Sequence, residues 1–516
     1  MSLLGFLLAV YALIGGLRVD TGDGEVVYQV TRSIAQTGSF AIPAPAEGQS
    51  LFGSWGRDGR FYGPYGLGAS LSLLPFYGLG AFVHRATGWA THGYVTRAAV
   101  ALRNIVAGAL TGWAVLLLAR RLEYSTQAAV FAALASVLAT PFVVYVKTTF
   151  SEPLVSLMLV LALAAVVEPP ADVPVCRRHR SSAWRWLAAG GLLGFGFLVK
   201  PTVIAVAPAF VGYALWSQRA SSRWWALGAL AGPLVVSIGL TGWYNAVRFG
   251  SPLQTGYWGI HFRLAPWVGL YGLLLSPGKG LLLFCPLVVL GMLGWRRLAM
   301  RRPGPAWLIA ACAALYVGEH AIYSQWTGGG GWGPRLIVPI IPLLVVPLGE
   351  WKGNESGARA RELAAALLVA LSLVIQLPAV AVHWGRSAQA VYAESASEEE
   401  YKDRIRYRLA DSALWRQWVG LLEVSTLMRR PELRAQVVQT ARQVGLREAA
   451  WPLSIASDAD VLTRTVGLLA FNTFDFWWVY WPLLGAPLWA VGLAVAVLLA
   501  VAVVCGRSLD RVLRAR

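Results

Sequence analysis

The feature that most constrains this chain is a series of apolar runs, each long enough to cross a lipid bilayer. A membrane-spanning helix needs about 20 mainly apolar residues. Only 14% of the residues are charged, against about 25% in soluble globular proteins. The sequence therefore predicts an all-α polytopic membrane protein with about twelve transmembrane helices. They are expected to begin near Leu3, Ala98, Ala128, Leu154, Trp184, Val203, Trp224, Leu281, Ala306, Leu336, Leu363 and Trp477.

The distribution of arginine and lysine predicts the topology, because such residues concentrate on the cytoplasmic side. A further Gly- and Pro-rich apolar stretch, residues 66–82, is either a span or a helix lying in the interface. If it lies in the external interface, all the basic clusters fall on one side, so we interpret it that way and place both termini in the cytoplasm. The clusters are Arg120/Arg121, Arg177/Arg178/Arg180/Arg185, Arg219/Arg223, Arg296/Arg297/Arg301/Arg302, Lys352/Arg359/Arg361 and Arg507/Arg511/Arg514/Arg516.

This topology divides the chain into three parts. Residues 1–383 form a transmembrane catalytic domain with a first external loop at 18–97, and residues 3–17 are a retained first span without a signal peptide. Residues 384–475 form a small external helical cap, in which Tyr401, Ile405 and Leu409 stand at helical spacing. Residues 476–516 supply the last span and a cytoplasmic tail.

Cysteine content and net charge exclude several other classes of protein. The four cysteines, Cys176, Cys285, Cys312 and Cys505, are scattered, so they form neither a disulfide framework nor a CxxC metal site. The formal net charge of +18 is explained by arginines beside an anionic membrane surface. We therefore expect membrane lipids as partners, and no nucleic acid.

Acidic residues at the external membrane boundary are the candidate catalytic groups. Asp20, Asp23 and Glu25 follow the first span, and Glu152 lies in the short second external loop, YVKTTFSEPL. A carboxylate can act as a general base toward an attacking hydroxyl. Acids also favour helix N-termini, so Asp23 as a helix cap and Glu152 as the opening of a helix are alternatives that the sequence leaves open.

Cationic and aromatic residues in the external loops are the candidate substrate-binding groups. Arg335 ends the segment WTGGGGWGPR, whose four glycines permit close approach of a ligand and whose indoles offer flat surfaces. An aromatic belt at the interface explains the tryptophans equally well. Lysines and arginines in these loops could hold a phosphate. The candidates are Lys147, Arg263, Lys279, Trp326, Trp332, Arg335, His261 and Tyr65.

These loops, in this order, resemble the C-type membrane glycosyltransferases, especially bacterial relatives of the protein O-mannosyltransferases and of the lipid A aminoarabinose transferase (glycosyltransferase family 39-like). The resemblance covers residues 3–382. Asp23, Tyr28 and Gly38 match the family's Asp, aromatic and glycine frame on the first external helix. Gly24 stands where an acidic neighbour is usual, with Glu25 one position later, so the choice among Asp20, Asp23 and Glu25 stays open.

The resemblance implies a GT-C-like fold with external interfacial helices and an inverting glycosyltransferase on the external face of the plasma membrane. Such an enzyme moves a single sugar from a polyprenyl-phosphate donor to a protein, lipid or glycan acceptor. It implies no obligatory cofactor, and a divalent metal is compatible with the carboxylates but not required. The alternatives are a transporter or flippase of lipid-linked sugars, or a polysaccharide ligase or polymerase.

Overall fold

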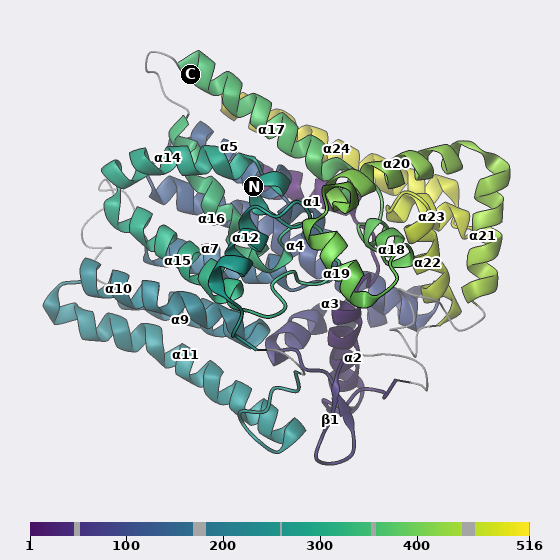
Figure 1. Ribbon diagram of the computed structural model, residues 1–516, viewed down its shortest axis with the longest axis horizontal. Coiled ribbons are helices and arrows are strands. Elements are labelled where there is room, and N and C mark those ends of the chain that lie inside the picture. The colour runs from purple at the N-terminus through teal and green to yellow at the C-terminus, as the bar shows by residue number, and fades with distance from the viewer. Residues whose placement is uncertain (46–51, 169–181, 258–260, 352–357, 446–459, 515–516) are drawn as a thin grey trace.

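The protein is built almost entirely of helices (Figure 1). The computed structural model describes residues 1–45, 52–168, 182–257, 261–351, 358–445 and 460–514. Within these ranges the strands are β1 (Ser54–Trp55) and β2 (Phe61–Tyr62), which pair antiparallel. The predicted all-α membrane class is confirmed. Cys176, Arg177, Arg178, Arg180, Lys352 and Arg516 lie outside the described residues.

The centre of the molecule is a packed group of apolar helices. α4 (His92–Arg121) contacts α1 (Ser2–Ile14), α5 (Thr126–Leu138) and α7 (Glu152–Val166), and α24 (Leu488–Arg514) lies against α1. Small residues bring these helices close together. A β-carbon at Gly112 of α4 would lie 2.3 Å from the Cδ1 of Leu7 in α1. The chain ends thus pack beside one another although about 500 residues separate them.

The remaining helices surround this centre. In Figure 1, α9, α10 and α11 lie together at the lower left, while α14, α15 and α16 lie above them. Their bounds are α6 (Phe142–Val146), α9 (Ser182–Val199), η1 (Pro201–Val206), α10 (Ala207–Ser217), α11 (Ala220–Phe249), α12 (Pro266–Leu274), α13 (Leu281–Phe284), α14 (Leu287–Arg301), α15 (Pro303–Ala321), η2 (Arg335–Ile340), α16 (Ile341–Val345), η3 (Val346–Trp351), α17 (Ala358–Ala381) and α23 (Trp477–Leu483).

Several predicted spans are divided into shorter pieces. The run that begins near Leu336 forms η2, α16 and η3, because prolines such as Pro339 remove backbone donors. The run near Leu281 is split into α13 and α14 before Leu287. The described residues contain five helices long and apolar enough to cross a membrane, at 67–87, 92–121, 220–249, 362–381 and 488–514, and six shorter apolar helices. The number of twelve spans therefore stays a prediction.

The predicted first external loop contains two helices that pack on each other, α2 (Gly22–Thr37) and α3 (Leu67–Thr87). The predicted apolar side of α2 is present, since Val27 and Val30 are buried and Ile34 is half-buried. α3 corresponds to the stretch that we interpret as interfacial. Its length and hydropathy also suit a span, so its depth in the membrane stays a prediction.

The described part of residues 384–475 is mostly helical. It contains α18 (Gly385–Ala393), α19 (Glu398–Tyr407), α20 (Ala413–Arg429), α21 (Pro431–Gly445) and α22 (Val461–Asn472), seen at the right of Figure 1. α19 and α20 are separated by a short 3-10 turn, residues 409–411. There Arg404 pairs with Asp411 at 2.7 Å and with Glu394 at 2.8 Å. We call this helical segment the cap.

The cap contacts two loops that lie outside residues 384–475. The amide of Gly278 donates to the carbonyl oxygen of Arg406 at 3.2 Å, and Ser412 donates to the carbonyl of Pro277 at 2.7 Å. A β-carbon at Gly330 would lie 3.2 Å from Ala388 and 3.4 Å from the hydroxyl of Tyr401. The glycine-rich segments of the sequence thus form the surface on which the cap packs.

We expect Gly278→Ala to loosen the cap, because the added β-carbon would lie only 1.8 Å from the carbonyl oxygen of Ile405. Overpacking of this kind costs roughly 1–3 kcal/mol. The measurement is limited proteolysis of the purified protein, with earlier cleavage expected between residues 384 and 475. The control is Gly239→Ala, where the new β-carbon meets nothing within 4 Å. Equal cleavage rates in both variants would contradict the close packing of the cap on Gly278.

Candidate functional site

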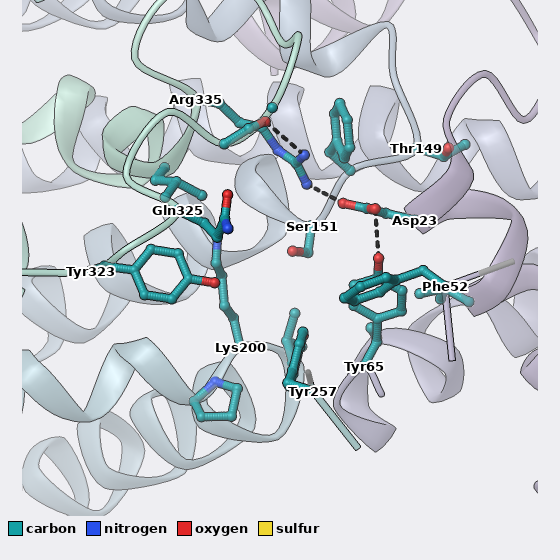
Figure 2. A pocket seen from close by; sticks show the side chains of 18 of the residues that line it. Asp23, Phe52, Tyr65, Thr149, Ser151, Lys200, Tyr257, Tyr323, Gln325 and Arg335 are labelled. Carbon is teal, nitrogen blue, oxygen red and sulfur yellow. Dashed lines mark hydrogen bonds and ion pairs between the residues drawn. The ribbon is translucent and has the colours of Figure 1, made fainter. Parts of the chain in front are cut away.

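A cavity of about 310 Å³ lies where the start of α2, the loop before α7, the α9–η1 junction and the glycine loop meet. We use "glycine loop" for residues 327–334. Figure 2 shows Asp23 between Arg335 and Tyr65 on one side of the cavity, with Lys200, Tyr323 and Gln325 on the other. Segments that are far apart in the sequence therefore supply one polar site.

Asp23 lies in the first turn of α2. Thr21 caps this helix by accepting a hydrogen bond from the amide of Gly24 at 2.9 Å, so Asp23 is not the capping residue. Tyr65 donates its hydroxyl hydrogen to Oδ1 of Asp23 at 2.5 Å, and Arg335 forms an ion pair with Oδ2. Burial and the Asp23 carboxylate raise the pKa of Tyr65, so the phenol keeps its proton and remains a donor.

Arg335 links the two acidic segments of the chain. Its Nε donates to Oε1 of Glu152 at 3.1 Å, and its Nη1 donates to the carbonyl oxygen of Gly328 at 3.2 Å. The guanidinium also lies 3.5 Å from the centre of the Phe150 ring. Gly328 has a φ of +63°, a conformation that favours glycine. The glycine loop can therefore turn sharply and direct its carbonyl toward Arg335.

Glu152 holds a second cation, Lys200, which the sequence analysis missed. The ammonium group of Lys200 lies 3.1 Å from the same Oε1 that accepts from Arg335. Glu152 is fully buried and lies behind the cavity wall, whereas Lys200 lines the cavity. The available signal was a single lysine between two apolar runs, at the point where the predicted topology places a short external turn.

Arg103 supplies a third positive charge to the wall. Its Nη2 donates to the carbonyls of Thr149 at 2.7 Å and Phe150 at 2.9 Å. The site thus contains three cations, Arg103, Lys200 and Arg335, and two carboxylates, Asp23 and Glu152. The difference of one positive charge, in surroundings of low dielectric constant, favours an anionic ligand.

The other two acidic candidates of the first loop lie away from the cavity. Glu25 is buried and accepts two hydrogen bonds from Arg97, at 2.6 and 3.0 Å. Asp20 accepts from the backbone amide of Thr149 at 3.0 Å. Asp23 is therefore the member of this group that lines the cavity, which removes the ambiguity that the sequence left open about position.

Lys147 and Lys279 do not line the cavity, so their contact with a donor phosphate stays a prediction without support from this site. The ammonium of Lys147 donates to the backbone carbonyl of Asp475 at 2.9 Å and lies 3.5 Å from its carboxylate. The ammonium of Lys279 donates to the carbonyl of Gly331, behind the glycine loop. Burial lowers the pKa of Lys279 to about 7, because the charged form is poorly solvated there.

Trp326 and Trp332, predicted to offer flat surfaces to a ligand, are both buried, so a role in stacking stays a prediction. Trp332 is buried, and its indole nitrogen donates to Gln376 at 2.8 Å. Trp326 is buried against Gly272, where a β-carbon would lie 2.3 Å from the ring. Both rings stabilise the loop from behind. His261 and Arg263 are exposed and lie outside the cavity wall.

The described residues contain no group of three or more His, Cys, Asp or Glu side chains able to hold a metal ion. The cavity does contain polar groups that bind nothing within the described protein. The hydroxyls of Tyr257 and Tyr323 and the amide of Gln325 line it and have no hydrogen-bond partner there. Sequence analysis had no signal for these residues.

We expect Glu25→Gln to destabilise the protein, because Arg97 would lose its charged partner in a buried site. Breaking a buried ion pair costs roughly 3–5 kcal/mol. Thermal unfolding in detergent should show a lower midpoint, and Glu25→Gln/Arg97→Gln should recover part of the loss. A stable Glu25→Gln protein that fails to transfer sugar would contradict the structural role and favour Glu25 as the base.

Comparison with known proteins relates this geometry to a family. Residues 92–243 match the family model described as dolichyl-phosphate-mannose-protein mannosyltransferase. No curated protein matches the chain. The matching segment contains Arg103, Glu152 and Lys200 of the cavity region.

Two solved structures are similar to this chain at low sequence identity. ArnT from Cupriavidus metallidurans bound to undecaprenyl phosphate is 18% identical, with a TM-score of 0.48 over 90% of this chain and 76% of that chain. The Archaeoglobus fulgidus oligosaccharyltransferase in the apo form is 14% identical, with a TM-score of 0.45 over 81% of this chain and 62% of that chain.

The family match confirms the resemblance predicted from the sequence. It also confirms the prediction that the chain is an enzyme, a membrane glycosyltransferase similar to those that the family model describes.

Proposed function

We propose that the protein transfers a single sugar from a polyprenyl-phosphate donor to an acceptor on the external face of the plasma membrane, with inversion at the transferred carbon. The observation that carries the proposal is the placement of Asp23 and Arg335 together in one cavity. This pair offers a carboxylate for the acceptor hydroxyl and a guanidinium for the leaving phosphate.

The donor phosphate is bound by Arg335 and Lys200. Glu152 joins the two cations through one oxygen atom, so they stay close together despite their mutual repulsion. As the bond between sugar and phosphate breaks, negative charge grows on the phosphate. A fixed pair of cations stabilises that charge more in the transition state than in the ground state. In this proposal Glu152 acts by holding the cations and does not touch the acceptor.

Asp23 is the general base. An inverting transfer uses a carboxylate that takes the proton of the attacking hydroxyl, without a covalent intermediate. In the free protein Arg335 occupies one oxygen of Asp23 and Tyr65 the other. A phosphate that attracts Arg335 would release the first oxygen, so binding of the donor would also expose the base. Tyr65 would keep the carboxylate oriented.

The cavity wall also suits a lipid-linked donor. Val27, Ala69 and Leu336 form an apolar part of the lining, next to the charged groups. An isoprenoid chain prefers such a surface and the membrane beyond it, while its phosphate remains at the polar end. ArnT has been solved with undecaprenyl phosphate bound, and the Archaeoglobus fulgidus oligosaccharyltransferase AglB has been solved in complex with a dolichol-phosphate. The cations of the wall supply positive charge, so the proposal requires no divalent metal.

We expect Asp23→Asn to lower sugar transfer roughly 100-fold or more, on the usual scale of general-base contributions, with little loss of stability. The measurement is turnover of a polyprenyl-phosphate sugar that wild type has been shown to use. Asp58→Asn is a matched control, because Asp58 lies in the same loop and also accepts from a tyrosine hydroxyl, that of Tyr62 at 2.7 Å, but outside the cavity.

Transfer at the wild-type rate in Asp23→Asn would overturn the assignment of the base. Release of free polyprenyl phosphate from proteoliposomes separates transfer from transport. A protein that moves the donor across the bilayer without releasing the phosphate lipid would instead be a flippase.

We expect a cysteine placed at Ser397 to react with a membrane-impermeant maleimide added from outside. Ser397 caps α19 of the cap, which the arginine distribution places externally. The background protein has its four native cysteines replaced, so labelling reports Ser397 alone. A cysteine at Ser508 of α24, near the predicted cytoplasmic tail, is the opposite-side control. Labelling of the Ser397 variant only after the membrane is opened would refute the external placement.

A further inference from the structure

Thr149 lies in the loop between α6 and α7 and lines the cavity, although it carries no group suited to acid–base chemistry. Its side chain points toward the start of α2. The hydroxyl donates to Oδ1 of Asp20 at 3.1 Å, and the backbone amide donates to the same oxygen at 3.0 Å. The hydroxyl also lies 3.3 Å from that of Thr21, the residue that caps α2.

Gly24 leaves room for Thr149 beside Asp23. A β-carbon at Gly24 would lie 1.9 Å from the hydroxyl oxygen of Thr149 and 2.8 Å from its β-carbon. No other residue type fits at position 24 unless the loop moves. Thr149 therefore contacts Asp20 and Thr21 before Asp23 and Gly24 after it, while Asp23 itself points into the cavity.

The opposite side of Thr149 is fixed to α4. Its carbonyl accepts from Nη2 of Arg103 at 2.7 Å. Asn104, the next residue of α4, donates to the carbonyls of Thr148 at 2.6 Å and Phe150 at 2.7 Å. The loop thus has a defined position relative to a long, well-packed helix. Because Thr149 also contacts the start of α2, the position of the loop constrains the first turn of that helix.

We propose that Thr149 is a positioning residue for the transfer reaction, which sets where the Asp23 carboxylate stands relative to Arg335. This inference rests on the proposed role of Asp23. Three contacts carry it: the hydrogen bonds to Asp20, the approach to the capping hydroxyl of Thr21 and the close packing on Gly24. Displacement of a catalytic group by about 1 Å can cost as much as 100-fold in rate.

The test compares Thr149→Val with Thr149→Ser. Valine keeps the size of threonine but removes the hydroxyl, whereas serine keeps the hydroxyl and removes a methyl group. We expect kcat to fall roughly 10- to 100-fold in Thr149→Val, with the KM for the polyprenyl-phosphate donor within about twofold of wild type. Thr149→Ser should restore kcat to within a few-fold of wild type.

Gly24→Ala provides a second test from the other side of the contact. This substitution changes none of the side chains of Asp23, Thr149 and Arg335. The added β-carbon forces the loop that carries Thr149 away from the start of α2. We expect the same pattern as in Thr149→Val, a loss in kcat with little change in KM. Asp58→Asn again serves as the unaffected control.

A purely structural role for Thr149 would give a different result. The midpoint of thermal unfolding in detergent would then be lower in Thr149→Val than in wild type. The kcat per folded molecule would stay at the wild-type value in both Thr149→Val and Thr149→Ser. Either wild-type kcat in Thr149→Val or a change confined to KM would overturn the inference. Transfer by wild type and its loss in Asp23→Asn are measured first, so a failure of the proposed function is seen separately.

Discussion

The site depends on one arginine that pairs with two carboxylates from distant parts of the chain. Arg335 contacts Asp23 at the start of α2 and Glu152 at the start of α7, in a region mostly shielded from water. A charge in such a place is stable only with partners, because the cost of removing it from water is several kcal/mol. The glycine loop, the start of α2 and the start of α7 must therefore come together for any of the three groups to be well placed. Lys200 joins the same arrangement through Glu152.

The sequence predicted the membrane class and a helix that carries Asp23 after the first apolar run. These predictions rest on strong and local signals. Long apolar runs have few alternatives to membrane helices, and an ionisable residue at the end of such a run needs a reason to be there. The position of Asp23 also followed from spacing within one short segment. Spacing did not decide which of Asp20, Asp23 and Glu25 faces the cavity. Arg97 binds Glu25 and Thr149 binds Asp20, and both partners belong to other parts of the chain.

The remaining parts of the site were hidden for a physical reason. Lys147 and Lys279 have the same sequence signature as Lys200, a lysine beside an apolar run, yet their ammonium groups bind backbone carbonyls behind the cavity. The two tryptophans look like an interfacial pair, but Gln376 and Gly272 bury them in the protein. In each case the direction of a side chain is decided by a partner that lies 40 or more residues away. Periodicity within one segment carries no information about such partners.

The glycine loop lies between the cap and the charged groups of the cavity. On one side Gly328 and Gly329 line the cavity, and on the other Gly330 faces Ala388 and Tyr401 of the cap. Because glycines have no side chains, a single layer of peptide backbone is the whole partition between the two. A substitution on the cap side of the partition can therefore shift this backbone, and with it the Gly328 carbonyl that accepts from Arg335, without replacing any charged residue.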